Sequence, residues 1–127
     1  MSTSTVAILG ASSDRSKFGN KSVRAHQQQG YKVFPVNPKG GEIEGLPAYQ
    51  SLSQVPCESL DRVSVYLPPH ICISVLDAVA EKGCRELWLN PGSESPEIIQ
   101  RARDLQLNVV VGCSIVDVGM SPNELSN

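Results

Sequence analysis

Residues 5–38 read TVAILGASSDRSKFGNKSVRAHQQQGYKVFPVNP, and they indicate how the rest of the chain folds. The first five are a short apolar run that ends at Gly10, which is typical of a buried strand followed by a tight turn. Residues 20–29 predict a helix that stops at Gly30, and residues 31–38 predict a second strand closed by proline. This stretch is therefore a strand–helix–strand unit.

The same alternation continues to residue 111. Further strands are predicted at 62–67, 86–89 and 107–111, helices from Pro69 to Gly83 and from Ser95 to about Gln106, a loop with one helical turn at 40–56, and a tail after 111. The strands are continuous apolar runs, which favours a parallel sheet covered by helices on both faces. We therefore predict an α/β protein of the Rossmann type. It is a single domain over residues 1–127, three layers (α/β/α) deep around a five-stranded parallel sheet.

Composition and charge limit the class of function. The chain is 40% hydrophobic and 19% charged, as in globular proteins, and it has no apolar run long enough for a membrane span. No basic signal-peptide region precedes the first strand, and the four cysteines form no CxxC pair. These features predict a cytoplasmic protein with reduced thiols and no metal site. Few aromatic residues and an acidic net charge argue against nucleic-acid binding.

The charge is unevenly distributed along the chain. Residues 1–41 carry six Lys or Arg and one acid, whereas residues 42–127 carry five bases and twelve acids. Solvated surface charge that drifts along the chain would explain this, and so would an anion bound by the first strand–helix–strand unit. In parallel α/β sheets, ligands bind beyond the carboxyl ends of the strands. The residues that follow each strand therefore decide between these readings.

The segment after the first strand has the parts of a phosphate-binding turn. Gly10 lets the backbone approach a ligand closely, and Ser12 and Ser13 offer hydroxyl and N–H donors. Lys17 adds a positive charge next to the N-terminus of the predicted helix, where anions are favoured. An ordinary loop between a strand and a helix would also need a glycine here.

The segments after the second and third strands extend this interpretation. Residues 36–39, Val-Asn-Pro-Lys, contain no acid of the kind that binds the ribose of NAD. Lys39 would instead attract a ribose phosphate, which both coenzyme A (CoA) and NADP carry. After the third strand, Pro68 and Pro69 form a rigid apolar edge that suits an extended pantetheine chain, although Pro69 is also a good helix start.

Residues 6–52 resemble the small stand-alone CoA-binding proteins of bacteria, a domain similar to the N-terminal domain of the succinyl-CoA synthetase α subunit. The resemblance reaches about residue 116, and its most specific parts are GAS with a downstream K-F-G, V-x-P-V-N-P and G-x-P-A-Y-x-S-L. It implies CoA as the cofactor. With Ser13 added for its donors, the predicted binding residues are Gly10, Ala11, Ser12 and Lys17 at the diphosphate, Val36, Asn37, Pro38 and Lys39 at the adenosine end, and Tyr66, Leu67 and Pro68 along pantetheine. The chain departs from many relatives at Leu67, where they have arginine.

No residue is predicted to be catalytic. His70 is the best candidate base, but no carboxylate at a useful spacing orients it. Cys113 follows the fifth strand and could meet the thiol of CoA, although packing explains it more simply. The predicted function is binding of CoA or an acyl-CoA without evident catalysis. An NADP- or nucleotide-binding regulatory domain and an interaction domain with a vestigial pocket are the alternatives, and a homo-oligomer or a partner protein is left open.

Overall fold

A five-stranded parallel sheet forms the centre of the computed structural model, which describes residues 4–125. The strands are β1 (Thr5–Leu9), β2 (Lys32–Val36), β5 (Leu60–Val65), β6 (Cys84–Leu89) and β7 (Val109–Val111), in the order β2-β1-β5-β6-β7. The helices are α1 (Phe18–Gln28), α2 (Pro69–Lys82), α3 (Pro96–Asp104) and α4 (Ser114–Asp117). All four strand pairings in this sheet are parallel.

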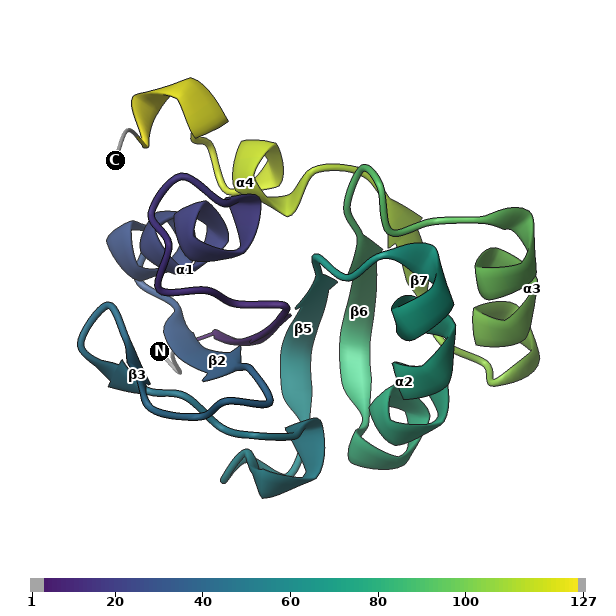
Figure 1. The fold of residues 1–127 in the computed structure, drawn as a ribbon. Coiled ribbons are helices and arrows are strands. Elements are labelled where there is room, and N and C mark those ends of the chain that lie inside the picture. The colour runs from purple at the N-terminus through teal and green to yellow at the C-terminus, as the bar shows by residue number, and fades with distance from the viewer. Residues whose placement is uncertain (1–3, 126–127) are drawn as a thin grey trace.

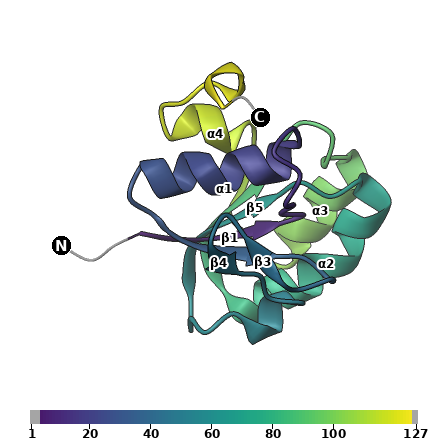
Figure 2. The same cartoon turned by 60° about the vertical axis from the view of Figure 1, so that its left-hand side comes forward.

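Helices cover both faces of the sheet, so the molecule has three layers. Helices α1 and α4 pack together on one face, and α2 and α3 lie on the other (Figures 1 and 2). The predicted Rossmann-type arrangement with a five-stranded parallel sheet is therefore confirmed. None of the helices within residues 4–125 has the length and apolar content needed to cross a membrane.

The hydrophobic core is divided between the two faces because successive side chains of a strand point in opposite directions. In β1, Ala7 and Leu9 belong to the larger cluster, which includes Leu76 of α2 and Ile98 of α3. Val6 and Ile8 belong to a second cluster with Val23 of α1. Strands buried on both sides in this way appear in the sequence as continuous apolar runs.

Two segments contain more structure than the sequence predicts. Within the predicted loop 40–56, β3 (Glu42–Ile43) and β4 (Leu46–Pro47) form an antiparallel hairpin that the sequence does not predict, whereas the 3₁₀ turn η1 (Leu52–Gln54) agrees with the one helical turn predicted there. The predicted tail contains α4 and a second 3₁₀ turn, η2 (Pro122–Glu124), and Ile115 and Leu125 of this region bury themselves against Ala25. Both segments are too short for a periodic signal, and their structure depends on these tertiary contacts.

Candidate functional site

A pocket of about 250 Å³ opens at the carboxyl ends of β1, β5 and β6. It is lined by Gly10, Lys17, Phe18, Gly19, Tyr66, Leu67, Pro68, Pro91, Gly92 and Ser93. These residues come from the three loops that lead from a strand into α1, α2 and α3, and from the first two residues of α1. In parallel α/β sheets this edge is the usual place for a ligand.

Two glycines allow the first loop to pack closely at this edge. Gly10 has a φ of 87°, and a Cβ atom there would lie 2.6 Å from the carbonyl oxygen of Tyr66. A Cβ atom on Gly19 would overlap the carbonyl oxygen of Gly10. The N-terminal turn of α1 therefore lies directly against the end of β1, at the wall of the pocket.

The helices that start at the pocket have N-termini without a side-chain cap. Neither Lys17 before α1 nor Pro68 before α2 accepts a capping hydrogen bond on its side chain, and neither helix has an acid in its first turn. By contrast, Ser95 caps α3 by accepting a hydrogen bond from Ile98 N at 3.2 Å, and Glu97 lies in the first turn of that helix. The positive ends of α1 and α2 thus have neither a side-chain cap nor an acid in their own first turn, although the Glu44 carboxylate accepts from Asn20 Nδ2 at 3.0 Å in the first turn of α1.

Five of the twelve predicted binding residues line this pocket: Gly10, Lys17, Tyr66, Leu67 and Pro68. Next to it, Ala11 is buried, Ser12 is half-buried and its hydroxyl accepts from Asp14 N at 3.0 Å, and Ser13 is exposed. Phe18 and Gly19 also line the pocket, and both belong to the K-F-G motif. Pro91, Gly92 and Ser93 line it as well, and their position after a predicted strand was the signal that could have identified them.

The other four predicted residues follow β2 and lie outside the pocket lining. Val36 is buried in the core, whereas Pro38 and Lys39 are exposed. The side chain of Asn37 is used within the protein: its Nδ2 donates to Ala11 O at 2.7 Å, and its Oδ1 accepts from Lys39 N at 2.8 Å. Asn37 therefore fastens the loop after β2 to the loop after β1.

A buried polar network lies beneath the pocket, on the α1 and α4 side of the sheet. The hydroxyl of Ser114 is 2.9 Å from Tyr66 Oη and 2.6 Å from Ser64 Oγ, and Asn90 Nδ2 donates to Ser64 Oγ at 2.8 Å. Burial raises the pKa of Tyr66, although the hydrogen bond with Ser114 acts in the opposite direction. Tyr66 therefore keeps its proton at neutral pH, and its ring is fixed from below.

The residues considered for chemistry have no catalytic partner in the structure. His70 is exposed near the start of α2 and makes no hydrogen bond or ion pair with another residue of the described part of the chain. Cys113 is half-buried before α4 and packs against the cluster of Ala25, Ile115 and Leu125. Across residues 4–125, His, Cys, Asp and Glu side chains form no group of three that could hold a metal ion.

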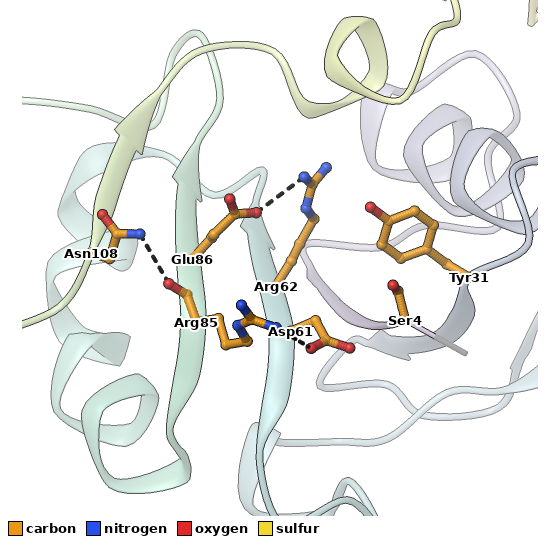
Figure 3. Close-up of a pocket in the computed structure, with 7 residues that line it drawn as sticks. All are labelled: Ser4, Tyr31, Asp61, Arg62, Arg85, Glu86 and Asn108. Carbon is orange, nitrogen blue, oxygen red and sulfur yellow. Dashed lines mark hydrogen bonds and ion pairs between the residues drawn. The ribbon is translucent and has the colours of Figure 1, made fainter. Parts of the chain in front are cut away.

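A second pocket, of about 300 Å³, lies at the opposite edge of the sheet and is lined by Ser4, Tyr31, Asp61, Arg62, Arg85, Glu86 and Asn108 (Figure 3). Its buried cation is Arg62, whose side chain is only 6% exposed. Arg62 Nη2 pairs with Glu86 at 3.1 Å and Asp117 at 2.7 Å, and the guanidinium carbon lies 4.7 Å from the centroid of the Trp88 ring. Opposite charges neutralise each other here, which favours a structural role over an anion site.

The comparisons with known proteins agree on one family. Residues 4–119 match the model of the CoA-binding domain. The chain is 33% identical over 81 residues to the α subunit of acetate–CoA ligase (ADP-forming) II from Pyrococcus furiosus, and 28% identical over 138 residues to that of ligase I. These alignments cover 63% and 96% of this chain but only 18% and 29% of the ligase subunits, so the chain spans less than a third of these relatives.

Solved structures of small proteins match more of their own length. A conserved hypothetical protein from Pyrococcus furiosus superposes with a TM-score of 0.82 at 32% identity, covering 90% of this chain and 98% of that one. A protein from Thermus thermophilus gives a TM-score of 0.83 at 31% identity, covering 91% and 87%. With a family model that matches nearly its whole length, this chain belongs to the family of CoA-binding domains.

Proposed function

We propose that this protein binds CoA or an acyl-CoA at the carboxyl edge of its sheet and performs no chemistry on it. The observation that carries the proposal is the meeting of two uncapped helix N-termini, those of α1 and α2, at one pocket that Lys17 also lines. Backbone N–H groups and helix dipoles favour anions at such a place. The diphosphate of CoA is the part of the ligand that this charge distribution suits.

The residues present fit the rest of the ligand. A cavity of about 250 Å³ is below the size of pockets that enclose a drug-sized ligand, about 300–1,000 Å³, so only part of CoA would be enclosed. We infer that the diphosphate lies in the pocket and the adenosine end extends over the loop after β2, where the exposed Lys39 is available for the ribose phosphate. Phe18, Leu67 and Pro68 offer an apolar path for pantetheine.

An NADP-binding regulatory domain is the second candidate. It is favoured by the same feature, a lysine and no acid in residues 36–39. A carboxylate at this place would select NAD, whereas Lys39 favours a phosphorylated ribose on either ligand. An interaction domain with a vestigial pocket would bind neither.

The thiols and the histidine support binding without catalysis. Burial raises the pKa of Cys72 and of Cys84 to about 11, so both thiols stay protonated at neutral pH and are poor nucleophiles. Among residues 4–125, His70 has no hydrogen-bond or ion-pair partner that would orient it as a base. All four cysteines are free, which is consistent with the cytoplasmic location that we propose.

We expect CoA to raise the melting temperature more than NAD does. At a hundred times its Kd, a ligand that binds only the folded state stabilises it by about 2.7 kcal/mol, which is a shift of roughly 8 °C for a chain of this length. Differential scanning fluorimetry with CoA, NADP and NAD at equal concentrations measures the order.

The three ligands distinguish the candidates. A larger shift with NADP than with CoA supports the second candidate, and no shift with any of them supports a vestigial pocket. Acetyl-CoA should act as CoA does and be recovered intact after incubation. Its hydrolysis above the buffer rate would contradict the absence of catalysis.

Lys17 and Lys39 are expected to contact phosphates of the ligand. Replacing either by alanine should weaken CoA binding about tenfold and flatten the dependence of the affinity on salt, because each removes one exposed charge pair. Isothermal titration calorimetry at several salt concentrations measures both effects. Lys32→Ala is the matched control, because Lys32 is an exposed lysine that begins β2 at the opposite edge of the sheet. Equal affinities for the double variant Lys17→Ala/Lys39→Ala and the unaltered protein would contradict this assignment.

A further inference from the structure

The loop between β1 and α1 has three backbone carbonyls that are held by side chains of the protein. Ala11 O accepts from Asn37 Nδ2 at 2.7 Å, and Ser12 O accepts from Asn20 Nδ2 at 2.9 Å. Arg15 O accepts from Arg24 Nη2 at 2.9 Å. One donor, Asn37, follows β2, and the other two, Asn20 and Arg24, lie on α1. None of the three donors therefore belongs to the β1–α1 loop that they hold.

Asn20 and Arg24 fix one another one turn apart on α1. Both are buried, at 0% and 7% exposure. Arg24 Nε donates to Asn20 Oδ1 at 2.7 Å. Because a guanidinium can only donate, this bond sets the orientation of the Asn20 amide, with Oδ1 toward Arg24 and Nδ2 toward Ser12 O. Asn20 Nδ2 also donates to Glu44 Oε2 at 3.0 Å, so the amide is held from three directions.

Holding the carbonyls inward has a consequence for an anion at the pocket. A carbonyl oxygen that faced a phosphate would repel it, whereas an N–H group would bind it. The N–H groups of Ser12 and Ser13 donate to no residue among 4–125, so they are not committed to the fold. The carbonyls of Ala11, Ser12 and Arg15 are therefore satisfied by the body of the protein, while the N–H groups of Ser12 and Ser13 remain for a ligand.

We propose that Asn20 and Arg24 are positioning residues of the anion site. They turn the carbonyls of Ser12 and Arg15 away from the ligand, so that the N–H groups of this loop can bind the diphosphate. Neither residue lines the pocket, and both act through the loop. The inference rests on the proposed function, because it assumes that a phosphorylated ligand occupies this edge of the sheet.

The test is the isosteric substitution Asn20→Asp combined with Glu44→Gln. The aspartate keeps an oxygen for Arg24 but has no N–H for Ser12 O, and the glutamine removes the repulsion between two carboxylates. Arg24 is a poorer target, because its Nη2 also donates to Leu125 O at 3.2 Å and its loss would loosen the C-terminal segment. Glu44→Gln alone, which keeps an oxygen to accept from Asn20 Nδ2, and Asn108→Asp are the controls. Asn108 makes the same kind of bond, from Nδ2 to Arg85 O at 3.0 Å, at the opposite edge.

We expect the double variant to unfold cooperatively and to bind CoA at least tenfold more weakly, with both controls near the affinity of the unaltered protein. The salt dependence of binding should persist, because the lysines are intact. In amide NMR spectra, CoA should shift the Ser12 and Ser13 signals of the unaltered protein downfield and leave them largely unmoved in the double variant.

The outcomes separate this inference from the proposed function. If the unaltered protein does not bind CoA, the proposed function is wrong. If it binds CoA and the folded double variant binds equally well, the proposed function stands and the positioning role of Asn20 is overturned. Equal losses in the double variant and in Asn108→Asp would also overturn it, because the effect would then be general.

Discussion

Replacing Gly19 by alanine should lower the free energy of unfolding by about 3 kcal/mol, the upper range for a group forced into a packed interior. Gly19 lies in the first turn of α1, where a Cβ atom would overlap the carbonyl oxygen of Gly10 and crowd Ala11. The helix would have to move away from the end of β1, which would also open the site. Helix propensity alone predicts the opposite sign, a gain of about 1 kcal/mol for glycine to alanine inside a helix.

Urea denaturation followed by circular dichroism measures this loss, and calorimetry with CoA measures the accompanying loss of affinity. Gly112→Ala is the matched control. The nearest atom to its added Cβ would be in the Trp88 ring at 3.6 Å, an ordinary contact, so a change within about 0.5 kcal/mol is expected. A Gly19→Ala variant as stable as the unaltered protein would mean that α1 does not pack against β1 as closely as described.

Acid should destabilise the fold through His26. This residue is fully buried on α1, where Nδ1 lies 2.8 Å from Ser22 O and the ring packs edge-on against Tyr31 with centroids 5.0 Å apart. Burial lowers its pKa from 6.5 to about 4, and the nearby charge of Arg62 acts in the same direction, while Asp117 opposes it. In the unfolded chain, His26 is therefore protonated below about pH 6.5, whereas in the folded protein it is protonated only below about pH 4.

The contribution of neutral His26 to the free energy of unfolding is therefore fully present above pH 6.5 and is lost as the pH falls toward 4. Between pH 7 and pH 4.5 the loss from this one group is about 2.5 kcal/mol, a large share of the stability of a small domain. Chemical denaturation at pH 7 and at pH 4.5 measures it. His26→Gln should lose much less stability over this interval, since it cannot titrate, and the carboxylates contribute equally in both proteins. The same pH dependence in His26→Gln would assign the effect to other groups.

The sequence identifies the sheet because its signals are local and repeated. Each strand is an apolar run that ends at glycine, proline or asparagine, and the alternation with helices leaves few topologies. The predicted bounds differ from the observed ones by a few residues; β5, for example, begins at Leu60 rather than Arg62. The hairpin at Glu42–Pro47 and α4 escape prediction, because two to four residues carry no period.

The sequence likewise predicts some features of the candidate site and misses others. Gly10, Lys17 and Tyr66 all line the pocket, and the sequence predicts their common edge because a parallel sheet brings everything that follows a strand to one edge. The sequence does not predict that the Asn37 side chain bonds to the loop after β1. An amide that follows a strand can form hydrogen bonds with a ligand or with a neighbouring loop equally well. Its hydrogen bond to Ala11 O joins residues 26 positions apart.

By itself, the sequence determined the fold class and the family, and it predicted that the proposed ligand residues gather at one edge of the sheet. Apolar periodicity, turn residues and motifs are properties of short stretches of chain, and they act before any tertiary contact forms. Only the tertiary structure decided which polar side chains make hydrogen bonds within the protein and which remain available to a ligand. Asn20 and Arg24 lie on a helix whose sequence shows nothing unusual, yet they hold the loop that carries the predicted ligand residues. A hydrogen bond needs its two atoms at a fixed distance and direction, and for residues far apart in sequence that geometry exists only once the chain has packed.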